Sequence, residues 1–345
     1  MERIRAKSKN AAIAYDLIES LQTRFVDKLT IISKEQGSGD GFSPVEWFRD
    51  EGRHGGGVRF EGKDEKIFNR ASVNLSQVQY DDDKSKNLAS ATAISTIIHP
   101  KNPLAPSVHM HFSWTEMKDG NGYWRLMADL NPSINNNADK EKFASILKNV
   151  ASEQYEEAAA QGDKYFYIPA LGRHRGITHF YLEAYNTGNA DEDLALTKKV
   201  GEAAIDGYCE ILDNALKSRT TPSEVDYKKQ LDYHTLYLFQ VLTLDRGTTS
   251  GLLVHDQNDV GIMGSIPSHI NKSLLASWEN KVDAPQDKLV QTLVNCLPEG
   301  DICLVDEEVK QKLANGVRSH YQSHPEAINM QASGNTTPPT VANHK

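Results

Sequence analysis

Two strictly alternating runs separated by a tight turn constrain the fold of this chain more than any other feature. Residues 107–117 and 122–130 each alternate apolar and polar side chains, and Asp119-Gly120-Asn121-Gly122 between them is a strong turn signal. Side chains on a strand point alternately to opposite faces, so a register that pairs the two apolar sets also pairs the two polar sets. The pattern predicts a β-hairpin whose polar face carries His109, His111, Ser113, Arg125 and Asp129.

Composition and charge exclude several classes of protein. The net charge of −9, with the positive residues scattered, argues against a general nucleic-acid binder. No apolar run of about 20 residues would span a membrane. The N-terminus lacks the apolar core of a signal peptide, and the three cysteines have no paired spacing, so we expect free thiols in a cytoplasmic protein.

The length of 345 residues allows a sizeable core, and no clear linker divides the chain. We therefore expect one domain over residues 1–322. The polar, Pro-containing segment 323–345 is predicted to be a disordered tail.

Hydrophobic periodicity outlines the other elements. Helical spacing predicts helices over 10–33, 140–161, 191–219, 289–297 and 307–317. Strand-like runs cover 66–80, 89–99, 165–169, 180–185, 233–244 and 260–266, and residues 35–57 are Gly-rich and turn-prone. Helices at both ends around many hairpin-like strands indicate an α+β fold with an antiparallel sheet.

Three local motifs each admit a functional and a simpler interpretation. His109 and His111 on one strand face have a spacing that can chelate a metal, but a polar strand face is the better explanation of the pair alone. The basic turn at 172–176 suits the capture of a carboxylate or phosphate, and a solvated loop is as compatible. The segment 245–248 reads by default as a salt-bridged turn. These residues predict a polar cleft with anion contacts, without indicating a reaction.

Several motifs follow one another in a fixed order from about Phe42 to Val317. They are Gly55-Gly56-Gly57 with the stretch 67–76, His99-Pro100-x-Asn102-Pro103-x-x-Pro106-x-x-His109, Asp129-Leu130-Asn131-Pro132, 165–169 with Arg175-Gly176-Ile177, Asp245-Arg246-Gly247-Thr248 with 251–252, and Ser265-Ile266-Pro267. In this order they resemble the motifs of the oxygen-dependent coproporphyrinogen III oxidase family.

The resemblance implies a large flat antiparallel sheet flanked by helices on both sides, and a homodimer. It implies the oxidative decarboxylation of two propionates of coproporphyrinogen III to vinyl groups, which forms protoporphyrinogen IX in heme biosynthesis. Molecular oxygen would be the electron acceptor, carbon dioxide and peroxide the other products, and no organic cofactor would be needed.

The resemblance also assigns roles to single residues. Asp129 would face the pyrrole N–H groups, where a carboxylate makes the ring electron-rich toward oxygen, and His109 would donate a proton. In bacterial members the positions of His99 and His109 are assigned to a divalent metal. The substrate-binding positions implied for this chain are Ser95, His111, Ser113, Arg125, Arg175 and Arg246.

Some positions depart from the family pattern. The family has Arg at Ser113 and Gly-Gly-Gly at 125–127, and two further metal-assigned histidines correspond to Ala170 and roughly Lys142. We hypothesise that Arg125, on the same face as Ser113, replaces the missing guanidinium. Two alternatives stay open: an altered or inactive paralogue that binds a tetrapyrrole or related anionic ring, and an oxidase that acts on a less carboxylated porphyrinogen.

Overall fold

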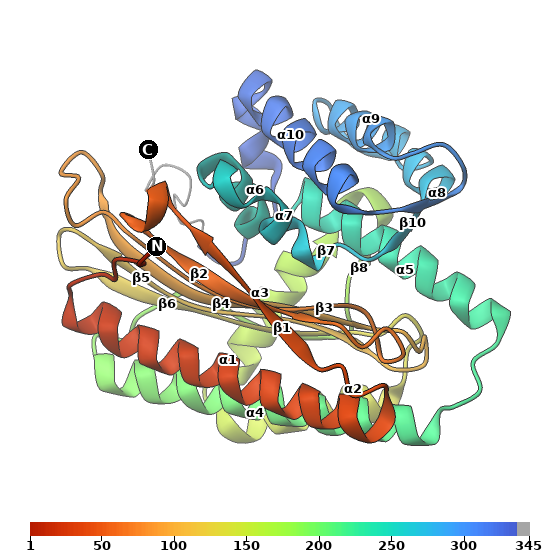
Figure 1. The fold of residues 1–345 in the computed structure, drawn as a ribbon, viewed down its shortest axis with the longest axis horizontal. Helices are drawn as coiled ribbons and strands as arrows, with labels where there is room; N and C mark the ends of the chain where they lie inside the picture. Colours follow the sequence, from red (N-terminus) through yellow and green to blue (C-terminus); the bar gives the residue numbers. More distant parts are fainter. Residues whose placement is uncertain (337–345) are drawn as a thin grey trace.

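The computed structural model describes residues 1–336 and shows a large antiparallel sheet with helices on both sides (Figure 1). Neighbouring strands follow the order β1-β2-β3-β4-β5-β6-β9, and every pair is antiparallel. The predicted α+β architecture is therefore confirmed. The strands are β1 Phe42–Phe48, β2 Gly55–Gly62, β3 Phe68–Gln79, β4 Leu88–Pro100, β5 Ser107–Met117, β6 Gly122–Asn131 and β9 Thr178–Tyr185.

The predicted hairpin is confirmed, with its register. Strands β5 and β6 pair so that His109 lies opposite Asp129 and Ser113 lies opposite Arg125. The apolar set of each strand belongs to the main hydrophobic core, and the polar set lies on the other face.

The apolar face of the sheet is covered by two long helices, α1 (Lys9–Gln36) and α4 (Ala190–Ser218) (Figure 1). Each begins at a side-chain cap that satisfies a free backbone N–H: Ser8 accepts from the Ala11 amide, and Asn189 accepts from the Glu192 amide. Two further helices complete this part, α2 (Asn137–Val150) against α4 and α3 (Tyr155–Phe166) against β9.

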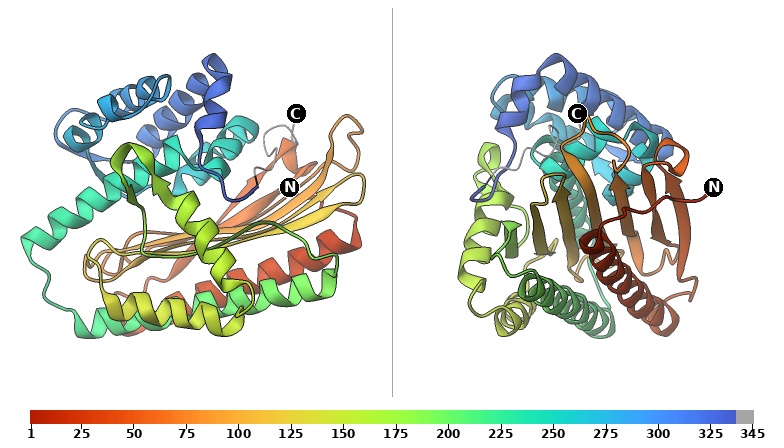
Figure 2. Two further views of the ribbon diagram at one scale, coloured as in Figure 1. Left: turned by 180° about the vertical axis from the view of Figure 1, so that it is seen from behind. Right: turned by 90° about the vertical axis from the view of Figure 1, so that its left-hand side faces the viewer.

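The polar face is covered by the C-terminal part of the chain, which holds a second hydrophobic core (Figure 2). Two short two-stranded sheets, β7–β8 (Tyr167–Ile168 with Arg173–His174) and β10–β11 (His269–Asn271 with Ile302–Leu304), lie outside the large sheet. The helices are α5 Glu224–Thr243, α6 Arg246–Val254, α7 Asp259–Ile262, α8 Lys272–Ala276, α9 Gln286–Cys296 and α10 Glu307–Ser323, with the 3₁₀ turns η3 Asp256–Asn258 and η4 Met263–Ser265.

Two predicted strands are wrong, and both belong to this covering layer. Residues 233–244 lie in helix α5, where every residue from Tyr233 to Thr243 is buried. A helix that is buried on all sides shows no 3.6-residue alternation of apolar and polar positions. Its aromatic and β-branched residues then give the pattern expected of a strand. Residues 260–266 form α7 and η4 instead of a strand.

Three smaller expectations also need correction. The helix predicted over 140–161 is interrupted at 151–154 and continues as α3, which absorbs the start of the strand predicted at 165–169. The turn-prone stretch 35–57 contains β1 and the beginning of β2, because strand neighbours supply backbone partners that local propensity does not reveal.

The segment that follows α10 has defined contacts, contrary to the disorder expected from residue 323. Residues Pro325–Met330 form a 3₁₀ turn with Ala327 fully buried, and the Ala332 amide donates to the Leu244 carbonyl at 3.0 Å. A few apolar residues that dock on the C-terminal core outweigh the polar composition. Residues 337–345 of the predicted tail lie outside the described residues, and a single domain over 1–322 stays a prediction.

Among residues 1–336, none of the helices has the length and apolar character needed to cross a membrane. The three cysteines, Cys209, Cys296 and Cys303, are free thiols as expected.

Candidate functional site

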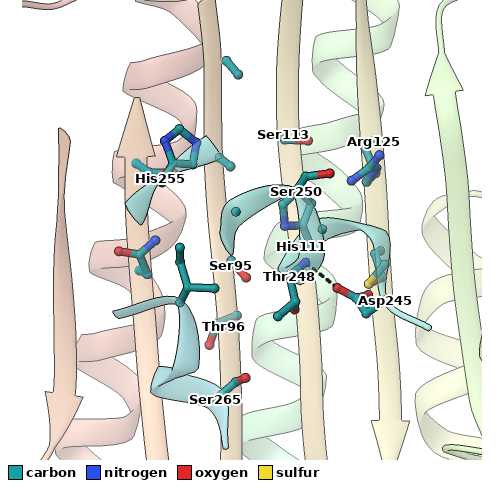
Figure 3. A pocket seen from close by; sticks show the side chains of 18 of the residues that line it. Ser95, Thr96, His111, Ser113, Arg125, Asp245, Thr248, Ser250, His255 and Ser265 are labelled. Carbon is teal, nitrogen blue, oxygen red and sulfur yellow. Dashed lines mark hydrogen bonds between the residues drawn. The ribbon is translucent and has the colours of Figure 1, made fainter. Parts of the chain in front are cut away.

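A cavity of about 250 Å³ lies between the polar face of the sheet and the segment from α6 to η4 (Figure 3). This volume is just below the roughly 300–1,000 Å³ of typical ligand sites. The sheet contributes Ser95, His109, His111, Ser113 and Arg125 to the wall, and the covering segment contributes Asp245, Thr248, Ser250, His255 and Ser265.

Asp245 brings a carboxylate into the cavity because it caps helix α6. Its side chain accepts hydrogen bonds from the Thr248 amide at 2.7 Å and from the Tyr165 hydroxyl at 2.9 Å. Burial alone would raise the pKa of this carboxyl, but the Thr248 amide, the Arg175 guanidinium and the Tyr165 hydroxyl hold the pKa below its ordinary value. The cavity therefore contains an ionised carboxylate at neutral pH.

His109 is a neutral imidazole in this cavity. Burial and the nearby Arg175 guanidinium lower the pKa of His109. Arg175 Nη2 lies 3.0 Å from His109 Nδ1, and since a guanidinium only donates, Nδ1 must accept. The remaining proton of the neutral ring is therefore on Nε2.

Asp129 lies behind this pair and is not among the residues that line the cavity, so its expected role at the pyrrole N–H groups stays a prediction. Its carboxylate is fully buried, 3.0 Å from Arg175 Nη2 and 3.3 Å from His179 Nε2. Gly176 is required beside it: its φ is +81°, and a Cβ there would come within 2.4 Å of an Asp129 oxygen. Asp129 is thus a buried counterion for Arg175, which in turn contacts His109.

Arg125 lines the cavity next to Ser113, as the hairpin register predicted, but it is not free. Its Nε donates to the buried carboxylate of Glu183 on β9 at 2.7 Å, and the Tyr181 hydroxyl donates to the same carboxylate. Burial alone would lower the pKa of Arg125, but Glu183 raises it above the ordinary value, so the guanidinium stays charged.

The other predicted site residues are divided between the cavity and its surroundings. Ser95 and His111 line it, and burial lowers the pKa of His111 to about 3. Arg246 lies on α6 outside the wall, and its Nε donates to the Ala332 carbonyl at 2.8 Å. Of the basic turn, Arg173 is exposed and Arg175 is the buried partner of Asp129.

The residues suggested for a divalent metal do not fit one. His99 Nδ1 lies 2.9 Å from the Ser107 hydroxyl, and His109 is in contact with the Arg175 guanidinium, whose charge would repel a cation. Within residues 1–336, no group of three His, Cys, Asp or Glu side chains has an arrangement that could hold a metal ion.

Sequence reasoning missed two residues of the site, Asp245 and Glu183. Asp245 falls in a predicted turn, although an Asp directly before a helix is a common N-cap. The strand-like pattern of residues 233–244 hides this signal. Glu183 lies on a predicted strand, but only the pairing of β9 with β6 brings it to Arg125.

Comparison with known proteins identifies the family to which the chain is similar. Residues 14–297 match the model of the family described as coproporphyrinogen III oxidase. The oxygen-dependent coproporphyrinogen-III oxidase of Rickettsia bellii (strain RML369-C) is 28% identical over 281 residues, which cover 76% of this chain and 98% of that protein. The enzyme of the same name from Rickettsia akari (strain Hartford) is 30% identical over 243 residues, 66% of this chain and 84% of that protein.

The mitochondrial oxygen-dependent coproporphyrinogen-III oxidase of Rattus norvegicus is 28% identical over 271 residues. That match covers 71% of this chain and 59% of the rat protein, so the chain spans less than two thirds of this relative.

Proposed function

The chain belongs to the coproporphyrinogen III oxidase family, and on that premise we propose that it catalyses the oxygen-dependent oxidative decarboxylation of porphyrinogen propionates. In the standard reaction, two propionates of coproporphyrinogen III become vinyl groups and protoporphyrinogen IX is formed for heme biosynthesis. Each propionate loses carbon dioxide and a hydride equivalent. Oxygen accepts the two electrons, and one proton from the side chain and one from the surroundings complete hydrogen peroxide, so no organic cofactor is required.

A single observation carries this proposal: the carboxylate of Asp245 and the neutral imidazole of His109 line the same cavity. His109 belongs to the hairpin, and Asp245 belongs to the segment that covers it. An ionised carboxylate can accept hydrogen bonds from the pyrrole N–H groups of a porphyrinogen. This increases the electron density of the ring and so its reactivity toward oxygen. We assign to Asp245 this role, which the resemblance had given to Asp129.

His109 and Asp129 keep roles in the same proposal. His109 carries its proton on Nε2 and would donate it during the reaction. Asp129 would be a positioning residue, because it holds Arg175 and Arg175 fixes the imidazole through Nδ1. Ser95, His111, Ser113 and Arg125 would contact the substrate directly, whereas Arg175 and Arg246 would support the wall from behind.

The direct test is to incubate the protein with coproporphyrinogen III without oxygen, and then to admit oxygen. We expect the mono-vinyl intermediate, protoporphyrinogen IX and hydrogen peroxide. Asp245→Asn and His109→Asn should each lower kcat by about 10²–10⁴-fold, the usual contribution of an acid or base group. Asp16→Asn, an exposed change on α1 at the opposite face, should leave kcat unchanged.

A second candidate function is a paralogue that binds a tetrapyrrole without turnover. The observation that favours it is that Arg125 is already paired with Glu183. Tight binding of the ring with no vinyl product after oxygen is admitted would establish this alternative and refute the oxidase.

We also propose a cytoplasmic homodimer. The free thiols are compatible with a reducing compartment. The expectation of a dimer comes from the family resemblance. Sedimentation at micromolar concentration tests the dimer, and a purely monomeric protein would refute it.

A further inference from the structure

The wall of the cavity is rich in hydroxyl groups and poor in positive charge (Figure 3). Of the described residues that line it, Arg125 is the only one with a guanidinium or ammonium group, and Asp245 is the only one with a carboxylate. Most of the other polar side chains are serines and threonines from both the sheet and its cover, including Ser72, Ser95, Ser113, Thr115, Ser250 and Ser265.

The single lining guanidinium is already balanced. Arg125 donates to Glu183 at 2.7 Å, and the Glu183 side chain is almost fully buried, so their charges compensate each other out of solvent. The Arg125–Glu183 pair therefore adds no net charge, and Asp245 is the one carboxylate among the described lining residues.

The other nearby arginines are also committed to protein groups. Arg175 is fully buried against Asp129, and Arg246 donates to the Ala332 carbonyl. Neither lines the cavity. His109 and His111 add no charge at neutral pH, because burial lowers the pKa of both.

This charge balance limits what the cavity can bind. Each carboxylate that enters loses its hydration, and the loss is recovered only where a cation or several donors replace the water. A hydroxyl group supplies one hydrogen bond and no charge, so the hydroxyl groups of the wall can replace only part of that hydration.

We infer that this cavity selects porphyrinogens with fewer than four carboxylates, holding one carboxylate at Arg125 while its hydroxyl groups offset only part of the hydration that any further carboxylate loses. The inference rests on the proposed function, because it takes the ring compound of that reaction as the ligand. For coproporphyrinogen III, it means that the three-carboxylate mono-vinyl intermediate binds more tightly than the starting compound.

The test is equilibrium binding of two stable porphyrins, measured by the change in their absorption or fluorescence. Coproporphyrin III carries four carboxylates, and deuteroporphyrin IX carries two without added vinyl groups. We expect the wild-type protein to bind deuteroporphyrin IX at least tenfold more tightly, and Ser113→Arg to shift the ratio at least tenfold toward coproporphyrin III. Thr23→Arg, which adds the same charge on exposed α1, should leave the ratio unchanged.

Glu183→Gln is the second variant, since it releases Arg125 without adding volume. It should also shift the ratio toward coproporphyrin III. If the wild-type protein binds coproporphyrin III as tightly as deuteroporphyrin IX or more so, or if neither cavity variant shifts the ratio, the inference is refuted while the proposed function stands. If neither porphyrin binds, the inference is refuted, whereas the proposed function is decided separately by the admission of oxygen to coproporphyrinogen III.

Discussion

The two faces of the central sheet differ in function: the side chains of one face pack in the hydrophobic core, and those of the other face line the cavity. On β5, Val108, Met110 and Phe112 are buried in the core beneath α1 and α4, whereas His109 and His111 reach the cavity beneath the C-terminal helices. Adjacent residues of one strand thus serve the hydrophobic core and the site in turn. The difference teaches that stability and ligand selection can be changed separately along the same backbone.

The largest expected effect is a loss of stability from a substitution on the apolar face of the sheet. Phe112→Ala should lower the free energy of unfolding by about 3–5 kcal/mol, because it removes a fully buried ring from the main core. Ser113→Ala, one residue further and on the opposite face, should change it by less than about 1 kcal/mol. Denaturant unfolding of both variants measures this, and equal effects would contradict the separation of the two faces.

A second prediction concerns the part of the polar face that does contribute to stability. Arg175→Met removes the guanidinium that pairs with the buried Asp129 carboxylate and leaves only His179 beside it, which should cost about 3–5 kcal/mol. Adding Asp129→Asn to Arg175→Met should recover part of that loss. Urea denaturation of the single and double variants tests this, and a double variant with simply added losses would show that the two groups are not coupled.

A third prediction uses pH to compare the faces. His111 has a pKa lowered by burial to about 3, while an unfolded chain protonates it near the ordinary value of 6.5. Between these values the unfolded state binds more protons, so stability is complete above about pH 6.5 and falls as the pH decreases.

His111→Asn should therefore reduce the slope of unfolding free energy against pH by about 1.4 kcal/mol per unit between pH 4 and 6. Ser113→Ala, which removes no titrating group, serves as the control. An unchanged slope in His111→Asn would show that this imidazole is accessible to protons in the folded protein.

The smallest expected effect concerns the cover of the polar face. Asp50 and Gln257 exchange two hydrogen bonds of 2.9 Å, one through the Asp50 amide and one through its carboxylate, at the edge of that cover. Gln257→Ala should lower stability by only about 1 kcal/mol, because the pair is exposed, but it should speed hydrogen exchange of the α6 amides. Exchange rates in β5 provide the reference, and equal acceleration in both would refute a local effect.

The sequence predicts the hairpin and its register because period-two alternation is a local signal. It could not predict the covering layer to the same extent. The C-terminal half of α5 lacks the 3.6-residue period of an amphipathic helix because it is buried on all sides. Glu183 reaches Arg125 only through strand pairing across a long separation in sequence. The alternation places Asp129 and His109 on one face of the hairpin, but it does not reveal that Arg175 lies between their side chains.

Helix α5 joins the interior of the C-terminal layer to the roof of the cavity. Tyr237 and Val241 line the cavity, while Leu238 and Leu242 on the same helix are buried in the second core. A substitution that only repacks this interior would shift the roof as well. Substitutions in the second core can therefore alter the shape of the cavity before any of its polar residues changes.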